Sequence, residues 1–373
     1  MKIALGIFKY FPFGGLQVDM RNIALEFARR GEEVTVFTGE WNSEESFPGI
    51  RVEILKLSAL TNHVRALEFA RAFHRAAEGY DIKVAFNRFG GCDFYFAADD
   101  CYRAALDRRT GAFFLRHFGR YKVFSELEKA IFSPQSDTVI FYICQKQFEE
   151  FTAVYHTPLE RLIYLGPGVS SQFVLPDGEV RQQRRTALGI KENQNLALFV
   201  AANWKLKGGD RALESFAALP SEIKQQTRLH FVGGDGKGEA QKTAQRLGIL
   251  EYCCFHGPQK DTSAFVQAAD ILIHPARKEA TGGVIAEALA CGVPVIATGL
   301  CGYASLIRES GAGIVVEGDF SADGLFDAWQ TYFKDRERFA DLAAKAAGTL
   351  RLKGRSSDAV DIILSKRKSL CSR

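Results

Sequence analysis

Two glutamates and two adjacent glycines lie close together in the second half of the sequence. Glu279 follows the apolar run ADILIHP, Gly282 and Gly283 come next, and Glu287 completes an E-x7-E pattern. The segment predicts a strand, a polar loop and a helix that begins near Gly282, with Thr281 as its N-cap. Glycines at a helix start let a phosphate approach free N–H groups and the positive end of the helix dipole. Gly283 and Glu287 share one helical face, so Glu287 can accept hydrogen bonds from a ribose diol, and the segment predicts a nucleotide-sugar site.

Two lysines in the run ANWKLKGGDR provide the positive charge that a diphosphate leaving group needs. Lys205 and Lys207 follow LALFVAA at 196–202, the first strand expected in the second half. A cation at this strand end stabilises the negative charge that grows as a bond to phosphate breaks. Lys207 is the stronger candidate, and a solvated surface lysine is the alternative for both.

The first half contains small and acidic residues at the ends of expected strands. Gly14 and Gly15 lack the G-x-G-x-x-G spacing of dinucleotide sites, so they indicate either contact with a phosphate or sugar oxygen or only a tight turn. Asp19 is expected in the first turn of the following helix, where it either binds an acceptor or is favoured by the helix dipole alone. Asp99 and Asp100 end an apolar strand, where α/β proteins present polar chemistry, and capping of the next helix is the alternative. Their spacing is not that of a metal-binding D-x-D pair, so no metal is expected there.

Histidines and cysteines are expected to be structural. The eight cysteines form no C-x-x-C pair and show no metal-ligand spacing, which indicates reduced structural thiols. The histidines considered as catalytic bases are better explained as residues packed at strand ends or in loops; they are His63, His117, His256 and His274.

The elements that must position these residues follow an alternating β and α pattern. KIALGIF, a helix stopped at Gly31 and VTVFT form a βαβ unit, strand-like runs recur as far as RLIYL, and the pattern restarts at LALFVAA. This alternation predicts two Rossmann-like halves, each with a parallel, doubly wound sheet. The join is expected in the Gly- and Pro-containing stretch 165–169, which a simple turn would also explain.

Length and composition agree with a two-domain globular protein. A chain of 373 residues is too long for one ordinary core. No apolar run reaches the ~18 to 20 residues needed to span a bilayer, and the N-terminus predicts a buried strand instead of a signal peptide, so a cytoplasmic protein is expected. The formal net charge of +4 gives no support for nucleic-acid binding.

The segment 103–132 is locally basic and aromatic. Between Arg103 and Lys122 it carries six basic residues and only Asp107 as an acid, which gives six minus one, or +5. Interleaved aromatic residues are typical of interfacial amphipathic segments, so the segment predicts attachment to an anionic membrane. A basic helix whose aromatic residues face the core is the alternative, and docking of acceptor phosphates is compatible with both. The residues expected at the membrane are Arg108, Arg109, Phe113, Phe114, Arg116, Phe118 and Arg120.

Several motifs resemble a known family. The E-x7-E pattern followed by EALACGVPVIA resembles the donor-binding signature of retaining glycosyltransferase family 4. The runs KYFPFGGLQVDM, YFAADDCY, NWKLKGGDR and LCGYA resemble the lipopolysaccharide core heptose glucosyltransferase I group, and the resemblance covers nearly the whole chain. It implies an α/β GT-B fold of two Rossmann-like domains with a nucleotide-sugar cleft between them. Residues 1–166 would form the acceptor domain, 167–355 the donor-binding domain, and 356–373 a helix returning to the first domain.

The resemblance also implies an activity: transfer of glucose from UDP-glucose to an inner-core lipopolysaccharide heptose, with retained anomeric configuration and without a metal or other cofactor. The expected enzyme is a monomer on the cytoplasmic face of a Gram-negative inner membrane. Alternatives are another UDP-sugar on another lipid-linked acceptor, or a nucleotide-binding membrane-associated module without turnover. The family usually has an arginine several residues before Lys207, but none lies between Leu196 and Lys207, so Lys205 is the expected substitute.

The resemblance assigns residues to three parts of the site. Asp99, Lys207 and Glu279 would be catalytic, with Glu279 contacting sugar hydroxyls and having no nucleophilic role. Asp19 and Asp100 would bind the acceptor. The donor would be held by Gly14, Gly15, Lys205, Lys207, Glu279, Thr281, Gly282, Gly283 and Glu287.

Overall fold

The chain divides into two compact units in a computed structural model, which describes residues 1–12, 14–44, 46–108, 112–115, 118–234, 236–350 and 354–371. The first unit contains Met1–Gly168 together with Gly354–Arg373, and the second contains Val169–Lys353. The sequence prediction placed the boundaries at 166/167 and 355/356. Within the described residues, no helix combines the length and the apolar character needed to cross a membrane.

The first unit is built on a seven-stranded sheet in the order β3-β2-β1-β4-β5-β6-β7, and all neighbouring strands are parallel. The strands are β1 (Lys2–Tyr10), β2 (Glu33–Trp41), β3 (Ile50–Ile54), β4 (Ile82–Ala85), β5 (Phe94–Ala97), β6 (Val139–Tyr142) and β7 (Leu162–Tyr164). From β1 the chain adds strands in one direction as far as β3, and from β4 it adds them in the opposite direction, so the strand order reverses between β1 and β4. The carboxyl ends of these strands therefore flank a topological switch point, where open α/β sheets bind ligands.

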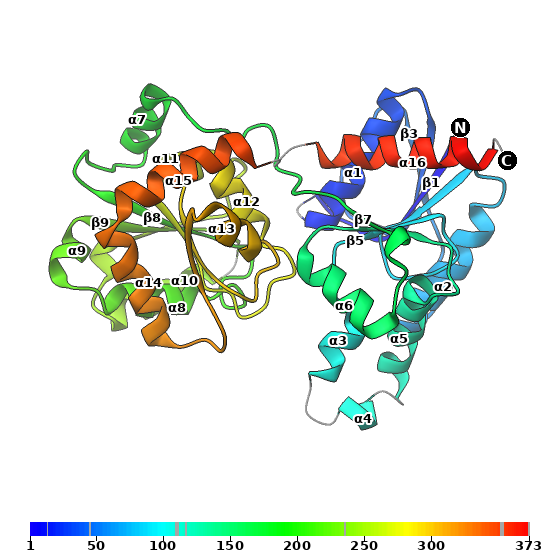
Figure 1. Cartoon of the computed structure of the whole chain (residues 1–373), viewed down its shortest axis with the longest axis horizontal. Helices are drawn as coiled ribbons and strands as arrows, with labels where there is room; N and C mark the ends of the chain where they lie inside the picture. The colour runs from blue at the N-terminus through cyan, green and yellow to red at the C-terminus, as the bar shows by residue number, and fades with distance from the viewer. Residues whose placement is uncertain are drawn as a thin grey trace. The chain divides into compact units, whose positions relative to one another are not determined.

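Helices cover both faces of this sheet (Figure 1). The helices are α1 (Gly15–Arg29), α2 (Asn62–Ala76), α3 (Tyr102–Asp107), α4 (Ala112–Leu115), α5 (Gly119–Phe132), α6 (Gln145–Tyr155), the short η1 (Leu159–Arg161) and α16 (Arg355–Cys371). Along β1, Ile3 and Leu5 pack in the cluster that contains α1 and α16, whereas Ala4 packs in the cluster of α2, α5 and α6. Because both faces are covered, the inner strands are largely apolar, as is usual for parallel sheets, whereas the edge strand β3 carries Arg51 and Glu53.

The second unit has a six-stranded parallel sheet in the order β10-β9-β8-β11-β12-β13. Its strands are β8 (Asn195–Val200), β9 (Thr227–Val232), β10 (Cys253–Gly257), β11 (Ile271–His274), β12 (Val295–Thr298) and β13 (Gly313–Val316). Its switch point lies between β8 and β11. The two parallel sheets confirm the predicted pair of Rossmann-like domains.

Ten helical segments of the described residues surround the second sheet (Figure 1). They are α7 (Gly178–Ala187), α8 (Gly209–Ala217), α9 (Ser221–Gln225), α10 (Lys237–Arg246), η2 (Leu250–Tyr252), α11 (Ser263–Ala268), α12 (Gly283–Ala290), α13 (Ala304–Ser310), α14 (Ala322–Lys334) and α15 (Arg336–Thr349). Helices α8, α10 and α14 form one apolar cluster with the sheet. Helix α12 packs on β11 and β12, and its Ile285 and Leu289 are fully buried.

Candidate active site

A lysine and a glutamate meet at the switch point of the second unit. Lys207 follows β8 and Glu279 follows β11, and the Lys207 Nζ lies 2.7 Å from Glu279 Oε2. Gly208 has φ of 80°, and a Cβ there would lie 2.0 Å from the carbonyl oxygen of Pro275. Only glycine allows this approach, so the sequence LKGG holds the loop after β8 against the loop after β11. The lysine ammonium also donates to the Lys278 carbonyl at 3.2 Å.

The Glu279 carboxylate is fixed on several sides. His274, at the end of β11 and 1% exposed, places Nε2 at 3.2 Å from Oε2, and the Ala280 N–H donates to Oε1 at 3.1 Å. Burial acts to raise the pKa of Glu279, but the hydrogen bond and charge of His274, followed by those of Lys207, outweigh it and lower the pKa to about 2. Glu279 is therefore an ionised, oriented hydrogen-bond acceptor. The structure brings together Lys207 and Glu279, which the sequence analysis assigned to one site, and His274 is a packed histidine that also orients the glutamate.

Helix α12 begins at Gly283, and its N-cap is Gly282. The prediction that Thr281 caps this helix is wrong, because Gly282 has φ of 83° and turns the chain into the helix without a side-chain cap. The Thr281 carbonyl instead accepts a hydrogen bond from the Tyr303 N–H at 2.7 Å. A Cβ at Gly283 would meet open space, and the first turn carries no acidic residue. The uncapped N–H groups of this turn are suited to an anion.

Glu287 lies one turn into α12 and is partly buried. Burial, acting alone, raises the pKa of Glu287 to about 7. Among the described residues, none donates a hydrogen bond to this carboxylate or forms an ion pair with it. A partly buried carboxylate without a protein donor is costly to keep ionised, and donors from a ligand such as a ribose diol would offset that cost.

Lys205 is directed away from the Lys207 and Glu279 pair. Its Nζ lies 3.1 Å from Glu239 of α10, and both side chains are more than half exposed. The structure thus does not bring Lys205 to the position expected for a substitute arginine. Sequence reasoning missed Arg277, which donates to both oxygens of Asp210 at 2.6 and 2.9 Å and to the Lys205 carbonyl at 2.8 Å. An arginine two residues before Glu279 in the same loop was the available signal.

The glycines after β1 differ in their surroundings. Gly14 is the N-cap of α1, and a Cβ there would lie 1.9 Å from Gln17 Oε1, so a larger residue would displace the Gln17 side chain. Gln17 is held in this place because its Nε2 donates to the Lys9 carbonyl at 3.1 Å. A Cβ at Gly15 would meet no atom within 4 Å. Tight packing accounts for Gly14, while Gly15 leaves the helix start open to a ligand.

The placement predicted for Asp19 is wrong. Helix α1 starts at Gly15 and has no acidic residue in its first turn, so Asp19 lies in the second turn. Its two oxygens accept from Nη1 of Arg355 at 3.1 and 2.9 Å, and Arg355 Nε donates to the Gly166 carbonyl at 2.8 Å. Burial raises the pKa of Asp19, and the arginine opposes this. Asp19 therefore links α1 to the start of α16. This ion pair gives Asp19 a structural role, whereas the sequence analysis expected it to bind the acceptor.

Asp99 and Asp100 form ion pairs after β5. Asp99 is 59% exposed and lies 3.3 Å from Nη1 of Arg88, and Asp100 lies 3.0 Å from Nζ of Lys146. The alternative that either residue caps α3 is wrong, because the N-cap is Cys101, whose Sγ accepts from the Ala104 N–H at 3.5 Å. Asp99 remains accessible to a ligand.

Sequence reasoning also missed Glu128, a fully buried carboxylate on α5. It accepts from the N–H groups of Tyr102 and Arg103 at 2.7 and 2.9 Å, from the Tyr155 hydroxyl at 2.7 Å and from Arg88 Nε at 3.2 Å. These bonds satisfy free backbone N–H groups at the start of α3, and they hold the Arg88 side chain beside Asp99. A glutamate on the apolar face of a helix, next to Leu127 and Ile131, was the only sequence signal.

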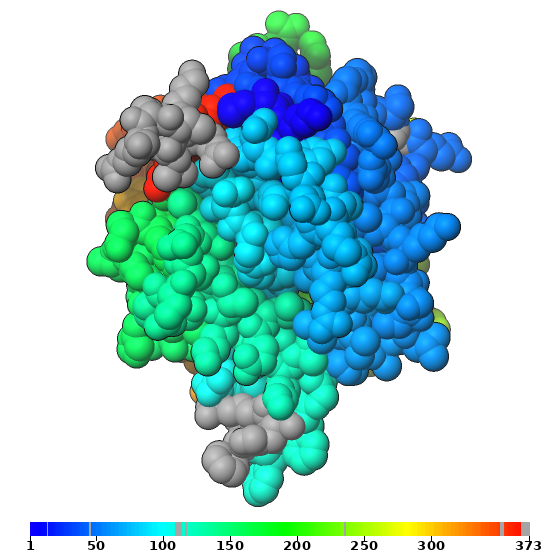
Figure 2. All heavy atoms as spheres, turned by 90° about the vertical axis from the view of Figure 1, so that its right-hand side faces the viewer, coloured from blue at the N-terminus to red at the C-terminus, as the bar shows by residue number. Residues whose placement is uncertain are grey.

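The described part of the basic and aromatic segment includes α4, which lies away from the sheet at one end of the first unit (Figure 1), and Figure 2 shows the face of this unit. Phe114 and Phe118 are 69% and 65% exposed, so these two do not face the core. Arg108 pairs with Glu150 at 2.9 Å, and Arg120 is exposed with its guanidinium 5.7 Å from the Phe124 ring. Of the other residues predicted at the membrane, Arg109, Arg116 and the side chain of Phe113 lie outside the described part of the chain.

The described residues of the second unit include a cluster of potential metal-ligating side chains. His230, Cys254 and His256 bring three potential ligand atoms within 4.8 Å of one another. Sequence spacing could not show this group, because His230 lies on β9 and the other two residues lie on β10.

Two parallel Rossmann-like units, with an oriented lysine and glutamate and an uncapped helix start at one switch point, define a glycosyltransferase of the GT-B class. Residues 180–348 match the family model for glycosyl transferases group 1. The chain is 35% identical, over 97% of its length and 98% of the relative, to lipopolysaccharide glucosyltransferase WaaG of Escherichia coli (strain K12). It therefore belongs to the lipopolysaccharide glucosyltransferase family within the group 1 glycosyl transferases.

Solved structures agree with this assignment. The crystal structure of WaaG, a glycosyltransferase involved in lipopolysaccharide biosynthesis, superposes with a TM-score of 0.87 at 34% identity, covering 97% of this chain and 99% of WaaG. Anabaena HepE, solved in complex with UDP and glucose, has a TM-score of 0.71 at 18% identity over the full length of both chains, which shows a shared fold.

Proposed function

We propose that this protein is a retaining glucosyltransferase that transfers glucose from UDP-glucose to an inner-core heptose of lipopolysaccharide. The observation that carries the proposal is the Lys207 and Glu279 pair beside the uncapped start of α12. Membership of the WaaG family supports the sugar and the acceptor.

The donor would be held by groups of the second unit. The N–H groups at Gly283 and the Lys207 ammonium suit the diphosphate, and the Glu287 carboxylate suits the ribose diol one turn further along α12. The ionised Glu279 would accept hydrogen bonds from hydroxyls of the transferred sugar. Lys207 would act most strongly as the bond to phosphate breaks, because negative charge then grows on the leaving oxygen.

Transfer would proceed on the front face of the sugar. The bond between the anomeric carbon and the β-phosphate oxygen breaks, the acceptor oxygen bonds to the same carbon, and the acceptor proton passes to the departing phosphate oxygen. UDP leaves with that proton. In this proposal Glu279 orients the sugar and is not a covalent nucleophile, since Lys207 and His274 hold its Oε2 and the Ala280 N–H donates to its Oε1. Lys207 and the helix N–H groups supply the positive charge, so we propose that transfer needs no metal.

We further propose that the enzyme works as a monomer on the cytoplasmic face of the inner membrane. The exposed Phe114 and Phe118, together with Arg108 and Arg120, support contact with an anionic lipid surface. Asp99, accessible beside Arg88, is the proposed polar contact near the reacting sugar.

A UDP-release assay with a panel of nucleotide sugars, with and without truncated-core lipopolysaccharide, tests the proposal. UDP-glucose with the acceptor should give the highest turnover. Faster release from UDP-galactose or UDP-N-acetylglucosamine would contradict the donor assignment. Binding of UDP without turnover on any donor would indicate a non-catalytic nucleotide-binding module.

A further inference from the structure

Three side chains with metal-binding atoms meet on one face of the second sheet. Cys254 and His256 lie on the edge strand β10, whose register with β9 pairs Cys254 with His230 and is irregular between Phe255 and Gly257. The His256 Nε2 lies 3.1 Å from the His230 Nδ1. All three ligand atoms lie within 4.8 Å of one another.

These separations are close to those of a tetrahedral site. With Zn–N bonds of about 2.0 to 2.1 Å at a tetrahedral angle, two imidazole nitrogens are about 3.3 Å apart, and a sulfur at about 2.3 Å from the metal is about 3.5 Å from each nitrogen. The two histidines already have the required spacing. The Cys254 thiol is exposed and can move about 1 Å by a rotation of its side chain.

The donor set selects a class of metal. Two imidazoles and one thiolate favour Zn²⁺ and similar borderline ions over Mg²⁺ or Ca²⁺, which prefer oxygen. One histidine must be neutral already, because in their mutual contact one ring nitrogen has to accept.

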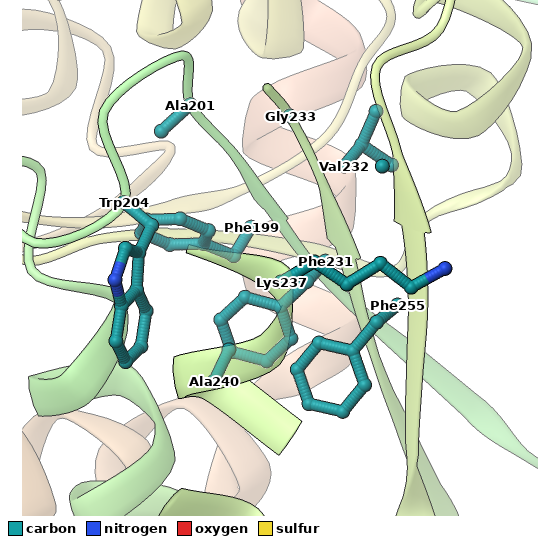
Figure 3. Close-up of a pocket in the computed structure, with 10 residues that line it drawn as sticks. Phe199, Ala201, Trp204, Phe231, Val232, Gly233, Lys237, Ala240 and Phe255 are labelled. Atoms are coloured by element: carbon teal, nitrogen blue, oxygen red, sulfur yellow. The ribbon is translucent and has the colours of Figure 1, made fainter. Parts of the chain in front are cut away.

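Packing holds the two imidazoles in place before any metal arrives. His230 is 3% exposed, and the ring of Phe265 from α11 meets the His256 ring edge-on with centroids 4.8 Å apart. The exposed Cys254 gives an entry path and leaves a fourth position for water. Figure 3 shows Phe231 and Phe255, the sequence neighbours of His230 and Cys254, in a separate apolar pocket with Trp204. That pocket belongs to the opposite face of the sheet, because neighbouring strand residues point to opposite faces.

We propose that His230, Cys254 and His256 bind a Zn²⁺-class transition metal ion that joins the edge strand β10 to β9. The site is separate from the donor site, since Lys207 and Glu279 follow β8 and β11. Its role is to stabilise the second unit, because a ligand that binds only the folded state shifts unfolding to higher temperature.

Cobalt provides a spectroscopic test on the full chain, freed of metal and kept reduced without added thiols. One equivalent of Co²⁺ should produce strong tetrahedral d–d absorption and a sulfur-to-cobalt charge-transfer band, and Zn²⁺ should displace it. Cys254→Ser should abolish the charge-transfer band, and His256→Gln should weaken Co²⁺ binding at least tenfold. The matched control is Cys253→Ser, which alters the neighbouring thiol on the opposite face and should leave the spectrum unchanged.

Thermal unfolding distinguishes Zn²⁺ binding at the proposed site from a non-specific effect of Zn²⁺ on the Tm. Zn²⁺ should raise the Tm of the wild type and of Cys253→Ser, and it should leave the Tm of Cys254→Ser unchanged. All variants should retain UDP-glucose binding, which shows that they fold. Absence of a charge-transfer band in the wild type, or an unchanged band in Cys254→Ser, would overturn the proposal.

Discussion

The Glu287 carboxylate makes UDP-glucose binding dependent on pH in a way that a single variant can test. In the free protein, burial raises the pKa of Glu287 to about 7. The ribose hydroxyls would donate to the ionised form, so binding should lower this pKa and release a proton. Affinity should be highest above neutral pH and should fall as the pH drops through 7. Glu287→Gln should bind more weakly at high pH and should lack this pH dependence.

The size of the effect follows from the shifted pKa. At about pH 5.5, which is about 1.5 pH units below this pKa, only about 3% of the Glu287 carboxyls would be ionised. The affinity for UDP-glucose should therefore fall about 30-fold, which is ~2 kcal/mol at 1.36 kcal/mol per pH unit. The same burial destabilises the folded, ligand-free protein. The penalty is absent below the unfolded-state pKa and complete above the folded-state pKa, so Glu287→Gln should gain up to about 3 kcal/mol at high pH and nothing at low pH.

Calorimetric titration of UDP-glucose across this pH range is the assay. UDP-glucose is preferable to UDP because both ends of its diphosphate are esterified, whereas a terminal phosphate titrates near about pH 6. Other titrating groups contribute equally to wild type and variant, so the difference between the two curves isolates Glu287. Parallel curves for wild type and Glu287→Gln would refute the placement of the ribose on this residue.

Three further predictions concern the lysine pair, the C-terminal helix and the membrane. Lys207→Ala should lower kcat about a hundredfold or more with little change in donor binding, whereas the control Lys205→Ala should lower it far less. Equal losses in steady-state kinetics would contradict the assignment. Complete loss of activity on chelation with recovery by Mg²⁺ would also contradict it when measured in Cys254→Ser, because that variant lacks the thiol of the proposed site at His230, Cys254 and His256. Arg355→Ala should destabilise the first unit by about 1 to 3 kcal/mol because it removes the ion-pair partner of an aspartate that is 14% exposed. Hydrogen exchange should become faster in α16, and unchanged exchange there would remove the structural role. Replacing Phe114 and Phe118 by Ser should reduce sedimentation with phosphatidylglycerol vesicles at least tenfold at low salt while UDP-glucose binding stays the same, and equal sedimentation would leave these residues without a membrane role.

The fold could be predicted because its signals are local. Strands covered on both faces are continuous apolar runs, and LALFVAA and ADILIHP both form buried strands that lead into the site. The resemblance assigned Lys207 and Glu279 to one site, and they lie together in the structure because each follows one of two neighbouring parallel strands. The Thr281 cap failed because a glycine with positive φ can start a helix without a side-chain cap, a choice that composition does not reveal.

The remaining features depend on contacts between distant parts of the chain. Asp19 and Arg355 are 336 positions apart, so no local pattern could show that this carboxylate is paired. Glu128 satisfies the start of α3 from a different helix, and His230 meets His256 only through the pairing of β9 with β10. In each case the tertiary fold, not the local sequence, decides which partner a polar side chain has.

The most direct test of the central claim is the structure of the product formed from UDP-glucose and truncated-core lipopolysaccharide. Nuclear magnetic resonance of the isolated core should show one new glucose on an inner-core heptose, and its linkage should have the anomeric configuration of the donor. A linkage of inverted configuration, or a wild-type enzyme that binds UDP-glucose but forms no product on this acceptor, would contradict it.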